Sequence, residues 1–128
     1  DMNIGIKGCR ELVVTEKLTA GSVGSGELDV YATPSMIALM EGTASESVKS
    51  GLEAGQGTVG TGISIRHLAA TPVGMKVRCE TELVEVDGRR LIFRIAAYDE
   101  KEKIGEGTHE RFIIYNERFQ NKANSKLG

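Results

Sequence analysis

The sequence predicts an α+β domain in which one helix packs on one mostly antiparallel sheet. Three observations lead to this class: a single convincing helical pattern at residues 33–53, alternating strand-like stretches after it, and short turns between those stretches. A helix and a sheet each have one apolar side, so they bury it against each other as two layers. The length of 128 residues suits one domain, and we expect a single domain over residues 1–128 with a polar tail from about residue 119.

The first part of the chain is expected to form a strand, a loop and then the helix. Residues 9–19 have a strand-like composition, whereas residues 20–32 are rich in glycine and serine and predict a surface loop. Thr33 is a good N-cap and Pro34 fits the first helical position. The helix is therefore expected to begin there and to end near residues 54–57.

Almost everything after the helix is expected to be strand. Alternation marks four stretches, at residues 57–69, 74–86, 89–100 and 105–117. It breaks at residues 83–86, which predicts a bulge or a strong bend, and Asp87 followed by Gly88 predicts a hairpin turn. A long helix wrapped by such a curved antiparallel sheet is the hotdog fold. Because isolated units of this fold leave sheet edges and usually pair, we expect a homodimer.

Composition and charge narrow the class of function. Hydrophobic residues make up 40% of the chain, and a net charge of -2 gives no basic surface for nucleic acid or an anionic membrane. No apolar run approaches the roughly 20 residues of a membrane span, and no signal segment is recognisable, so we expect a cytoplasmic protein. Cys9 and Cys79 lie outside any CxxC pair, and there are only two histidines. We therefore expect no metal site and two buried reduced thiols, with a disulfide between them left open.

A histidine lies where the pattern predicts burial. In GISIRH, residues 62–67, Ile63, Ile65 and His67 alternate with two polar residues, so His67 continues an apolar face. A buried imidazole needs hydrogen-bond partners. His67 is therefore either a core histidine bonded to a neighbour or a catalytic base.

The helix carries a carboxylate in a similar position. At about 100° per residue, Ile37, Met40, Ala44 and Val48 form an apolar stripe, and Glu41 falls inside it. A carboxylate there is costly unless it is paired or protonated. Glu41 is therefore either a stripe-edge residue bonded to water or backbone, or a general base or nucleophile with a tuned pKa.

Thr33 marks the start of the same helix. It can act simply as a cap, but the free N–H groups and the positive dipole end at a helix N-terminus also suit a developing oxyanion. Thr33 and Glu41 lie roughly 12 Å apart along a regular helix, so they do not touch directly. Either a substrate spans them, or they meet residues of a partner subunit.

Four blocks of sequence carry a family resemblance. They are ATPSMIALME at residues 32–41, GTVGTGISIRHLAATPVGMKV at 57–77, GRRL at 88–91 and IGEGTHER at 104–111. Together they resemble the fluoroacetyl-coenzyme A thioesterase group of the hotdog superfamily, and the likeness covers roughly residues 30–118. The resemblance implies a catalytic triad of Thr33, Glu41 and His67. It also implies that Gly60 helps to hold the substrate carbonyl or its support, and that Arg111 braces this glycine.

The implied reaction is hydrolysis of a small acyl-CoA thioester to a free acid and CoA, without a metal or a cofactor other than the CoA of the substrate. The loop at residues 20–32 contains only one aromatic residue, Tyr31, and is less aromatic than in the fluoroacetyl enzymes. We therefore expect a general small acyl-CoA thioesterase rather than one specific for a fluorinated acyl group. Arg66, Arg89 and Arg90 are candidates for binding the CoA phosphates.

Two other functions are weighed against this one. A hotdog hydratase would need a closely spaced Asp–His pair on one loop–helix segment, and both histidines lie instead in expected strands. A non-catalytic acyl-CoA-binding protein would not need all three triad residue types. The resemblance leaves open whether Thr33 or Glu41 is the nucleophile. It gives His109 no role, so replacing His109 is expected to leave turnover intact.

Overall fold

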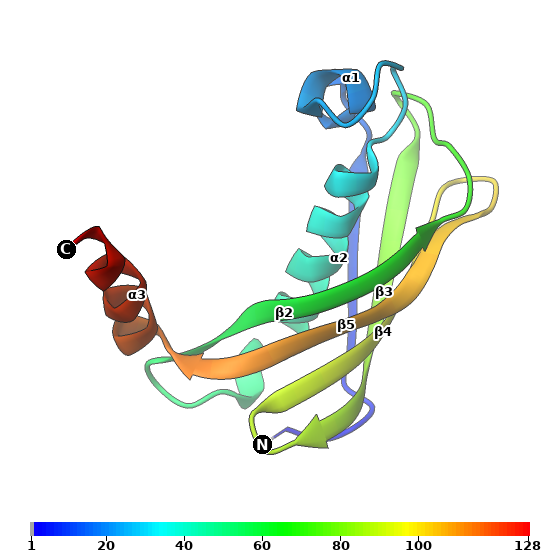
Figure 1. Ribbon diagram of the computed structural model, residues 1–128. Coiled ribbons are helices and arrows are strands. Elements are labelled where there is room, and N and C mark those ends of the chain that lie inside the picture. Colours follow the sequence, from blue (N-terminus) through cyan, green and yellow to red (C-terminus); the bar gives the residue numbers. More distant parts are fainter. Residues whose placement is uncertain (1) are drawn as a thin grey trace.

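A single five-stranded antiparallel sheet curves around one long helix in the computed structural model, which describes residues 2–128 (Figure 1). The helix is α2, Thr33–Ser47. The strands, in sheet order, are β1 (Lys7–Val13), β3 (Lys76–Asp87), β4 (Arg90–Tyr98), β5 (Lys103–Tyr115) and β2 (Gln56–His67). This arrangement confirms the predicted α+β class, and it makes β1 and β2 the two edges of the sheet.

Five short helical segments accompany α2 within residues 2–128. They are η1 (Glu16–Leu18), α1 (Ala20–Val23), η2 (Lys49–Gly51), α3 (Asn116–Asn124) and η3 (Ser125–Leu127). All but η2, which falls in the predicted helix, replace a predicted strand, loop or frayed tail. The Thr19 hydroxyl accepts a hydrogen bond from the backbone N–H of Ser22 at 3.3 Å and so caps α1. The prediction of a frayed tail was wrong, because residues 116–127 contain no glycine or proline that would break a helix. In Figure 1, α3 projects away from the body of the molecule.

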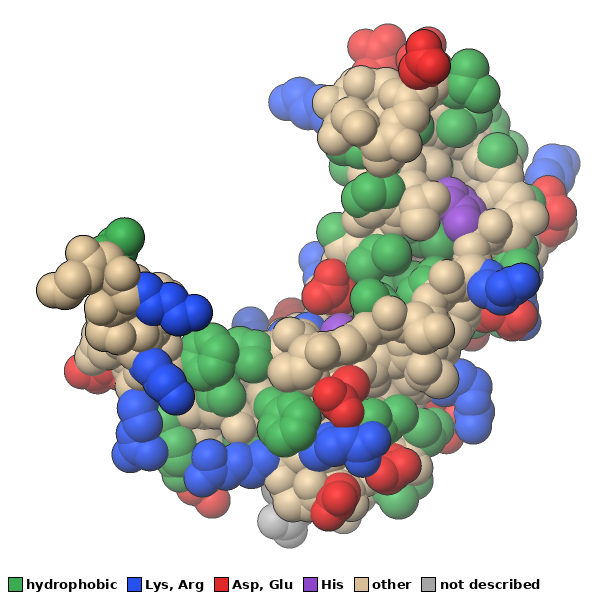
Figure 2. All heavy atoms as spheres, in the orientation of Figure 1, with side chains coloured by type: hydrophobic (Ala, Val, Ile, Leu, Met, Phe, Trp, Pro, Cys, Tyr) green, Lys and Arg blue, Asp and Glu red, His purple; other side chains and the backbone are tan. Residues whose placement is uncertain are grey.

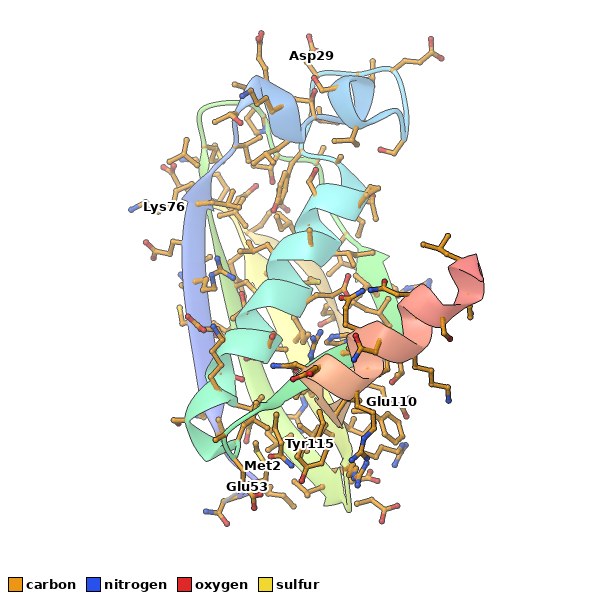
Figure 3. The ribbon with its side chains drawn as sticks, turned by 90° about the vertical axis from the view of Figure 1, so that its left-hand side faces the viewer. Met2, Asp29, Glu53, Lys76, Glu110 and Tyr115 are labelled. Atoms are coloured by element: carbon orange, nitrogen blue, oxygen red, sulfur yellow. The ribbon has the colours of Figure 1, made fainter. Side chains whose placement is uncertain are left out.

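The core lies between α2 and the concave face of the sheet. Met36, Leu39, Met40 and Ala44 are buried there, whereas Ile37 is only half-buried, so the buried stripe is rotated slightly from the predicted one. The sheet contributes apolar side chains mainly from β3, β4 and β5: Val77, Cys79, Leu83, Leu91, Phe93, Ile95, Ala97 and Ile104. Figure 3 shows the length of α2 over the sheet, with Asp29 near one end and Met2 and Glu53 near the other.

The end of α2 comes earlier than predicted. The helix stops at Ser47, and its last turn contains a serine hydroxyl that donates to the backbone carbonyl of Ala44 at 2.7 Å. Hydroxyls that bond to nearby backbone groups compete with the helix for its carbonyls. A short 3-10 turn, η2, then leads into β2.

Two bulges shape the sheet. The predicted one is confirmed by a register shift between Leu83 and Glu85 in β3. The hairpin that follows is also confirmed, although its turn residues are Gly88 and Arg89, one position later than expected. A second register shift, between Gly60 and Gly62 in β2, was not predicted.

Strand β2 is less covered than its apolar pattern suggested. Because α2 packs mainly over β3 and β1, Ile63 is 37% exposed and His67 is half-buried. The two cysteines also differ from expectation. Cys79 is buried but Cys9 is exposed, and both are free thiols. Because Cys79 pairs with Arg10 across the ladder and Cys9 with Glu80, their side chains lie on opposite faces of the sheet.

The corner after β2 is tied to two distant segments through Thr71, which is fully buried. Its carbonyl accepts the backbone N–H of Tyr31 at 2.8 Å, and its hydroxyl donates to a carboxylate oxygen of Asp99 at 2.8 Å. Asp99 also accepts the backbone N–H groups of Lys101 and Glu102 in the turn between β4 and β5. These bonds anchor the corner to the turn and to the chain just before α2.

Candidate active site

Thr33 and His67 are in direct contact. The Thr33 Oγ1 lies 2.6 Å from Nδ1 of His67. Ala32, not Thr33, is the N-cap of α2, and no side chain caps the helix. The prediction of Thr33 as N-cap was therefore wrong by one residue. Because Thr33 is already helical, its hydroxyl is free to bond to the histidine at the end of β2.

The imidazole of His67 is in a state that can accept a proton. Burial lowers its pKa below the ordinary value of 6.5, which keeps the imidazole neutral at pH 7. Its Nε2 is buried and has no hydrogen-bond partner within the described part of the chain. The Thr33 hydroxyl can therefore donate a hydrogen bond to Nδ1 of the neutral ring.

A cavity of about 460 Å³ opens beside this pair. Small side chains from the region of α1 and from the corner after β2 make most of its wall, including Ala20, Ala32, Ala69 and Ala70. Figure 2 shows that this side of the molecule is hollowed between the α1 end and the projecting α3, and that histidine atoms reach its surface. The cavity can admit a small acyl group next to the Thr33 hydroxyl.

Glu41 lies in a second cluster, around Gly60. A Cβ atom at Gly60 would be 2.9 Å from Oε2 of Glu41, 3.2 Å from Cε1 of His109 and 3.4 Å from Nη1 of Arg111. The missing side chain of Gly60 therefore makes room for all three groups. Glu41 is half-buried beside the apolar stripe, and its carboxylate makes no ion pair within 4.0 Å in the described chain.

Arg111 is held by three hydrogen bonds. Its Nε donates to Oγ1 of Thr58 at 2.8 Å, its Nη2 to the Thr58 carbonyl at 2.8 Å, and its Nη1 to Nε2 of His109 at 3.2 Å. The side chain is only 7% exposed, and this burial lowers its pKa, opposed by the negative charge of Glu41. A fixed positive charge thus faces Glu41 and Gly60.

The two clusters do not meet within one chain. Gly60 and His67 belong to the same strand, and seven steps of about 3.3 Å separate them by about 23 Å. Glu41 contacts the Gly60 end, whereas Thr33 contacts the His67 end. The three residues of the implied triad are therefore divided into a Thr33–His67 pair and a Glu41–Gly60–Arg111 cluster.

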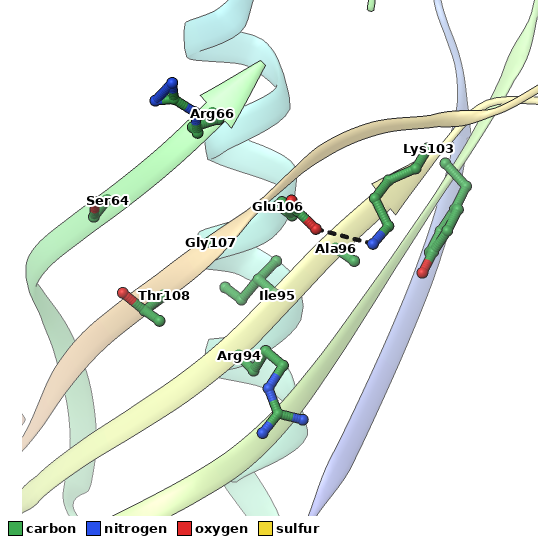
Figure 4. Close-up of a pocket in the computed structure, with 10 residues that line it drawn as sticks. Ser64, Arg66, Arg94, Ile95, Ala96, Lys103, Glu106, Gly107 and Thr108 are labelled. Carbon is green, nitrogen blue, oxygen red and sulfur yellow. Dashed lines mark hydrogen bonds and ion pairs between the residues drawn. The ribbon is translucent and has the colours of Figure 1, made fainter. Parts of the chain in front are cut away.

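The arginines suggested for CoA phosphates are placed very differently from one another. Arg66 lines a cavity of about 540 Å³ on the outer face of the sheet, away from the Thr33–His67 pair (Figure 4). Arg90 is already neutralised by Glu85 and Glu110, at 2.8 and 2.6 Å. Arg89 lies over the ring of Tyr115, at 6.0 Å.

Two classes of site have no counterpart in the described residues. No group of three or more His, Cys, Asp and Glu side chains among residues 2–128 is arranged to hold a metal ion. No helix in that part of the chain combines the length and apolar character needed to cross a membrane.

Sequence reasoning missed the part played by His109 and Thr58. Both contact Arg111. The Arg111–Thr58 and His109–Gly62 bonds join strands β5 and β2, which are far apart in the sequence. One signal was available: Gly105, Gly107, His109 and Arg111 follow one another at intervals of two residues along β5, so two polar side chains share one face with two glycines. Such a face has room for polar groups from the facing helix.

Comparison with known proteins agrees with this geometry. A family model described as fluoroacetyl-CoA-specific thioesterase matches residues 14–117. A fluoroacetyl-CoA thioesterase from Streptantibioticus cattleyicolor is 44% identical over 98 residues, which cover 77% of this chain and 70% of that protein. A solved variant of the fluoroacetyl-CoA thioesterase FlK in complex with acetyl-CoA is 35% identical, with a TM-score of 0.94 over 99% of this chain and 100% of that one. A thioesterase superfamily member from Thermus thermophilus is 29% identical, with a TM-score of 0.91 over 99% and 94% of the two chains.

The fold and the hydroxyl–imidazole pair define a hotdog-fold protein of the thioesterase superfamily. Within that superfamily, the chain belongs to the fluoroacetyl-CoA-specific thioesterase family, a family of thioester hydrolases.

Proposed function

We propose that this protein hydrolyses small acyl-CoA thioesters to the free acid and CoA, with Thr33 as the nucleophile. The observation that carries the proposal is the 2.6 Å contact between the Thr33 hydroxyl and Nδ1 of His67 beside a cavity of small side chains. Glu41 of the same chain lies too far along the helix to compete for the same carbonyl. No metal or further cofactor takes part, because a thioester is electrophilic enough for an activated hydroxyl, and CoA enters only as part of the substrate.

In the first step, the Thr33 oxygen attacks the thioester carbonyl while its proton passes to Nδ1 of His67. The free N–H groups at the start of α2 stabilise the negative oxygen that develops on the carbonyl. When the carbon–sulfur bond breaks, the CoA thiolate takes the proton from His67. An acyl ester on Thr33 and neutral His67 remain.

In the second step, water hydrolyses this ester. A carboxylate takes one proton from the attacking water, the bond between the acyl carbon and the Thr33 oxygen breaks, and the proton returns to that oxygen. Glu41 is the carboxylate that the family resemblance assigns. Because Glu41 of the same chain lies about 12 Å along the helix from Thr33, we assign this step to Glu41 of a second copy.

The second copy binds along β2 in this proposal. This edge strand extends from Gln56 to His67, and residues 60–64 are exposed. Exposed long edges are templates for pairing. Antiparallel pairing of β2 with itself, about a two-fold axis between Ile63 and Ser64, places Gly60 of one copy opposite His67 of the other. Each Glu41 then approaches the Thr33–His67 pair of the other subunit. Sedimentation at micromolar concentration is expected to show a dimer, and a clean monomer would contradict the shared site.

Substrate breadth follows from the cavity. The acetyl-CoA complex of FlK supports an acyl-CoA ligand for this family, and the wall here is made of small, mostly apolar residues without a closing aromatic group other than Tyr31. We therefore assign general activity on short acyl groups rather than specificity for fluoroacetyl-CoA. Two free thiols, one of them exposed, support a reducing cytoplasmic location.

A panel of acyl-CoA substrates tests the proposal directly. Acetyl-, fluoroacetyl-, propionyl- and hexanoyl-CoA are each incubated with wild type, Thr33→Ala and Thr33→Ser, and CoA release is measured with a thiol reagent. We expect the short acyl groups to react, Thr33→Ala to lose most of the rate, and Thr33→Ser to keep a large part of it because the hydroxyl remains. Equal rates for the alanine and serine variants would exclude Thr33 as the nucleophile. Binding of acyl-CoA without any turnover by the wild type would favour the acyl-CoA-binding alternative.

A further inference from the structure

His109 is buried at the centre of the sheet and both of its ring nitrogens are engaged. It is 2% exposed, and its ring lies beside the core residue Phe93, with centroids 6.2 Å apart. Nδ1 lies 2.8 Å from the carbonyl oxygen of Gly62, and Nε2 lies 3.2 Å from Nη1 of Arg111. A carbonyl can only accept and a guanidinium can only donate. The imidazole must therefore carry its proton on Nδ1 and accept at Nε2.

Burial supports the same protonation state. It lowers the pKa of His109 below 6.5, and the charge of Arg111 lowers it further, against the opposing charge of Glu41. A second proton on the ring would remove the acceptor from Arg111 and place two cations side by side. His109 therefore works as a neutral hydrogen-bond connector, with both ring nitrogens bonded to protein groups.

The connector holds the bulge in β2 from the helix side. The register of β2 against β5 shifts between Gly60 and Gly62, which leaves Thr61 as the extra residue. On the other face, the Thr61 hydroxyl donates to Oε1 of Glu110 at 2.7 Å, and Glu110 is paired with Arg90 at 2.6 Å. The bulge is thus fixed from both faces, by His109 inside and by Glu110 outside.

We propose that His109 is a positioning residue for the thioesterase reaction: it fixes the Gly60–Gly62 bulge and the Arg111 guanidinium, and through them the place of Glu41. This inference rests on the proposed function, because it takes Glu41 as the group that acts on the substrate. The link is direct in space, since Gly60 has Glu41, His109 and Arg111 around it, all within 3.4 Å of where a Cβ would stand. It reverses the expectation from sequence that His109 is dispensable.

Three substitutions separate the two hydrogen bonds of His109. His109→Ala removes both. His109→Gln places an amide oxygen near the position of Nε2, where it can accept from Arg111, and His109→Asn places an amide N–H near Nδ1, where it can donate to Gly62. Misplacing a catalytic group by about 1 Å costs on the order of 10²-fold in rate. We expect His109→Ala to lower kcat by about that factor with little change in KM, and His109→Gln to recover at least about tenfold more than His109→Asn.

A double-mutant cycle with Arg111→Ala shows whether His109 acts through the arginine. If it does, adding His109→Ala to Arg111→Ala should lower kcat by a smaller factor than His109→Ala does in the wild type, because only the bond to Gly62 is left to lose. Additive losses, or a folded His109→Ala protein with wild-type kcat, would overturn the proposal. Circular dichroism and sedimentation establish that each variant keeps its fold and its assembly.

A spectroscopic measurement needs no variant of His109 and no activity. The chain has two histidines, so ¹⁵N-labelled imidazoles give two spin systems, and His67→Ala leaves only His109. At pH 7 we expect the neutral ring with its proton on Nδ1. An imidazolium, or a proton on Nε2, would refute the connector. If the tautomer is as expected but the wild type hydrolyses no acyl-CoA, the proposed function fails while the connector remains.

Discussion

Mixing two inactive variants tests whether the active site is shared between subunits. Thr33→Ala removes the proposed nucleophile and Glu41→Gln removes the proposed catalytic carboxylate, so each homodimer should be nearly inactive. If the two subunits share their sites, a mixed dimer has one active site that contains both substitutions and one that contains neither. The prediction follows from distance: within one chain Glu41 lies beside Gly60, about 23 Å along β2 from His67, whereas the proposed pairing places it opposite His67 of the other copy.

The size of the effect can be calculated. At equal concentrations half of the dimers are mixed and each mixed dimer has one intact site, so the mixture should recover about a quarter of wild-type activity. The assay follows CoA release after the two variants are unfolded together in denaturant and refolded, with each variant refolded alone as its control. Recovery that stays at the sum of the two homodimers would show that Thr33 and Glu41 act from the same chain, and the proposed pairing of β2 would be wrong.

Three further outcomes are expected. Glu41→Gln should keep the fold and the assembly but lower kcat at least tenfold. The control Glu46→Gln, on the exposed side of the same helix, should match wild type. Equal rates for the two variants would remove Glu41 from the mechanism. Because burial lowers the pKa of His67, the imidazole stays neutral below pH 6.5, and kcat/KM should fall only at more acidic pH. A His67→Ala variant that keeps both the wild-type rate and this fall at acidic pH would refute His67 as the base. Gly60→Ala should lower kcat, since its methyl would stand 2.9 Å from Oε2 of Glu41 and 3.2 Å from the buried ring of His109. Unchanged kinetics would mean that the Gly60 cluster takes no part.

The free energy of unfolding should depend on pH through His67 and His109. His67 and His109 both have lowered pKa values in the folded protein. The unfolded chain therefore binds more protons, and the free energy of unfolding should fall as pH drops below about 6.5. His109→Gln should make this fall smaller, as measured by denaturant unfolding at pH 7 and pH 5. A pH dependence as large as in wild type would show that His109 titrates alike in both states.

Local pattern was enough to predict the elements that matter most. The cap-like residues before α2, the alternation of β3 and the break near Leu83 all depend on neighbours in sequence, and the structure confirms the elements that they indicate. The N-cap was predicted at Thr33 rather than Ala32 because a helix boundary is uncertain by a residue or more from sequence. That single residue decides whether the hydroxyl caps the helix or bonds to His67.

Long-range placement was harder to predict. The alternation around His67 predicted which face of the sheet its side chain lies on, but not how deeply it is buried. The burial depends on α2, which packs mainly over β3 and β1 rather than over β2. The bond from His109 to Gly62 joins residues that are 47 positions apart, and it exists only because β2 and β5 are neighbours in the sheet. Helical periodicity was enough to pick out Glu41 as a carboxylate on an apolar stripe. Only the family resemblance picked out its neighbours Gly60 and Arg111.

The bonds of Thr71 divide the walls of the acyl cavity into two kinds. The corner that carries Ala69 and Ala70 is held through Thr71 to Asp99 and to the backbone of Tyr31, so it has little freedom to retreat from a longer chain. The opposite wall, from residues 20–30, is mostly exposed and has no comparable anchor among its side chains. Selection for activity on bulkier acyl groups should therefore accumulate changes in residues 20–30 and leave the Thr71 corner untouched, which makes that segment the place to randomise in an engineering library.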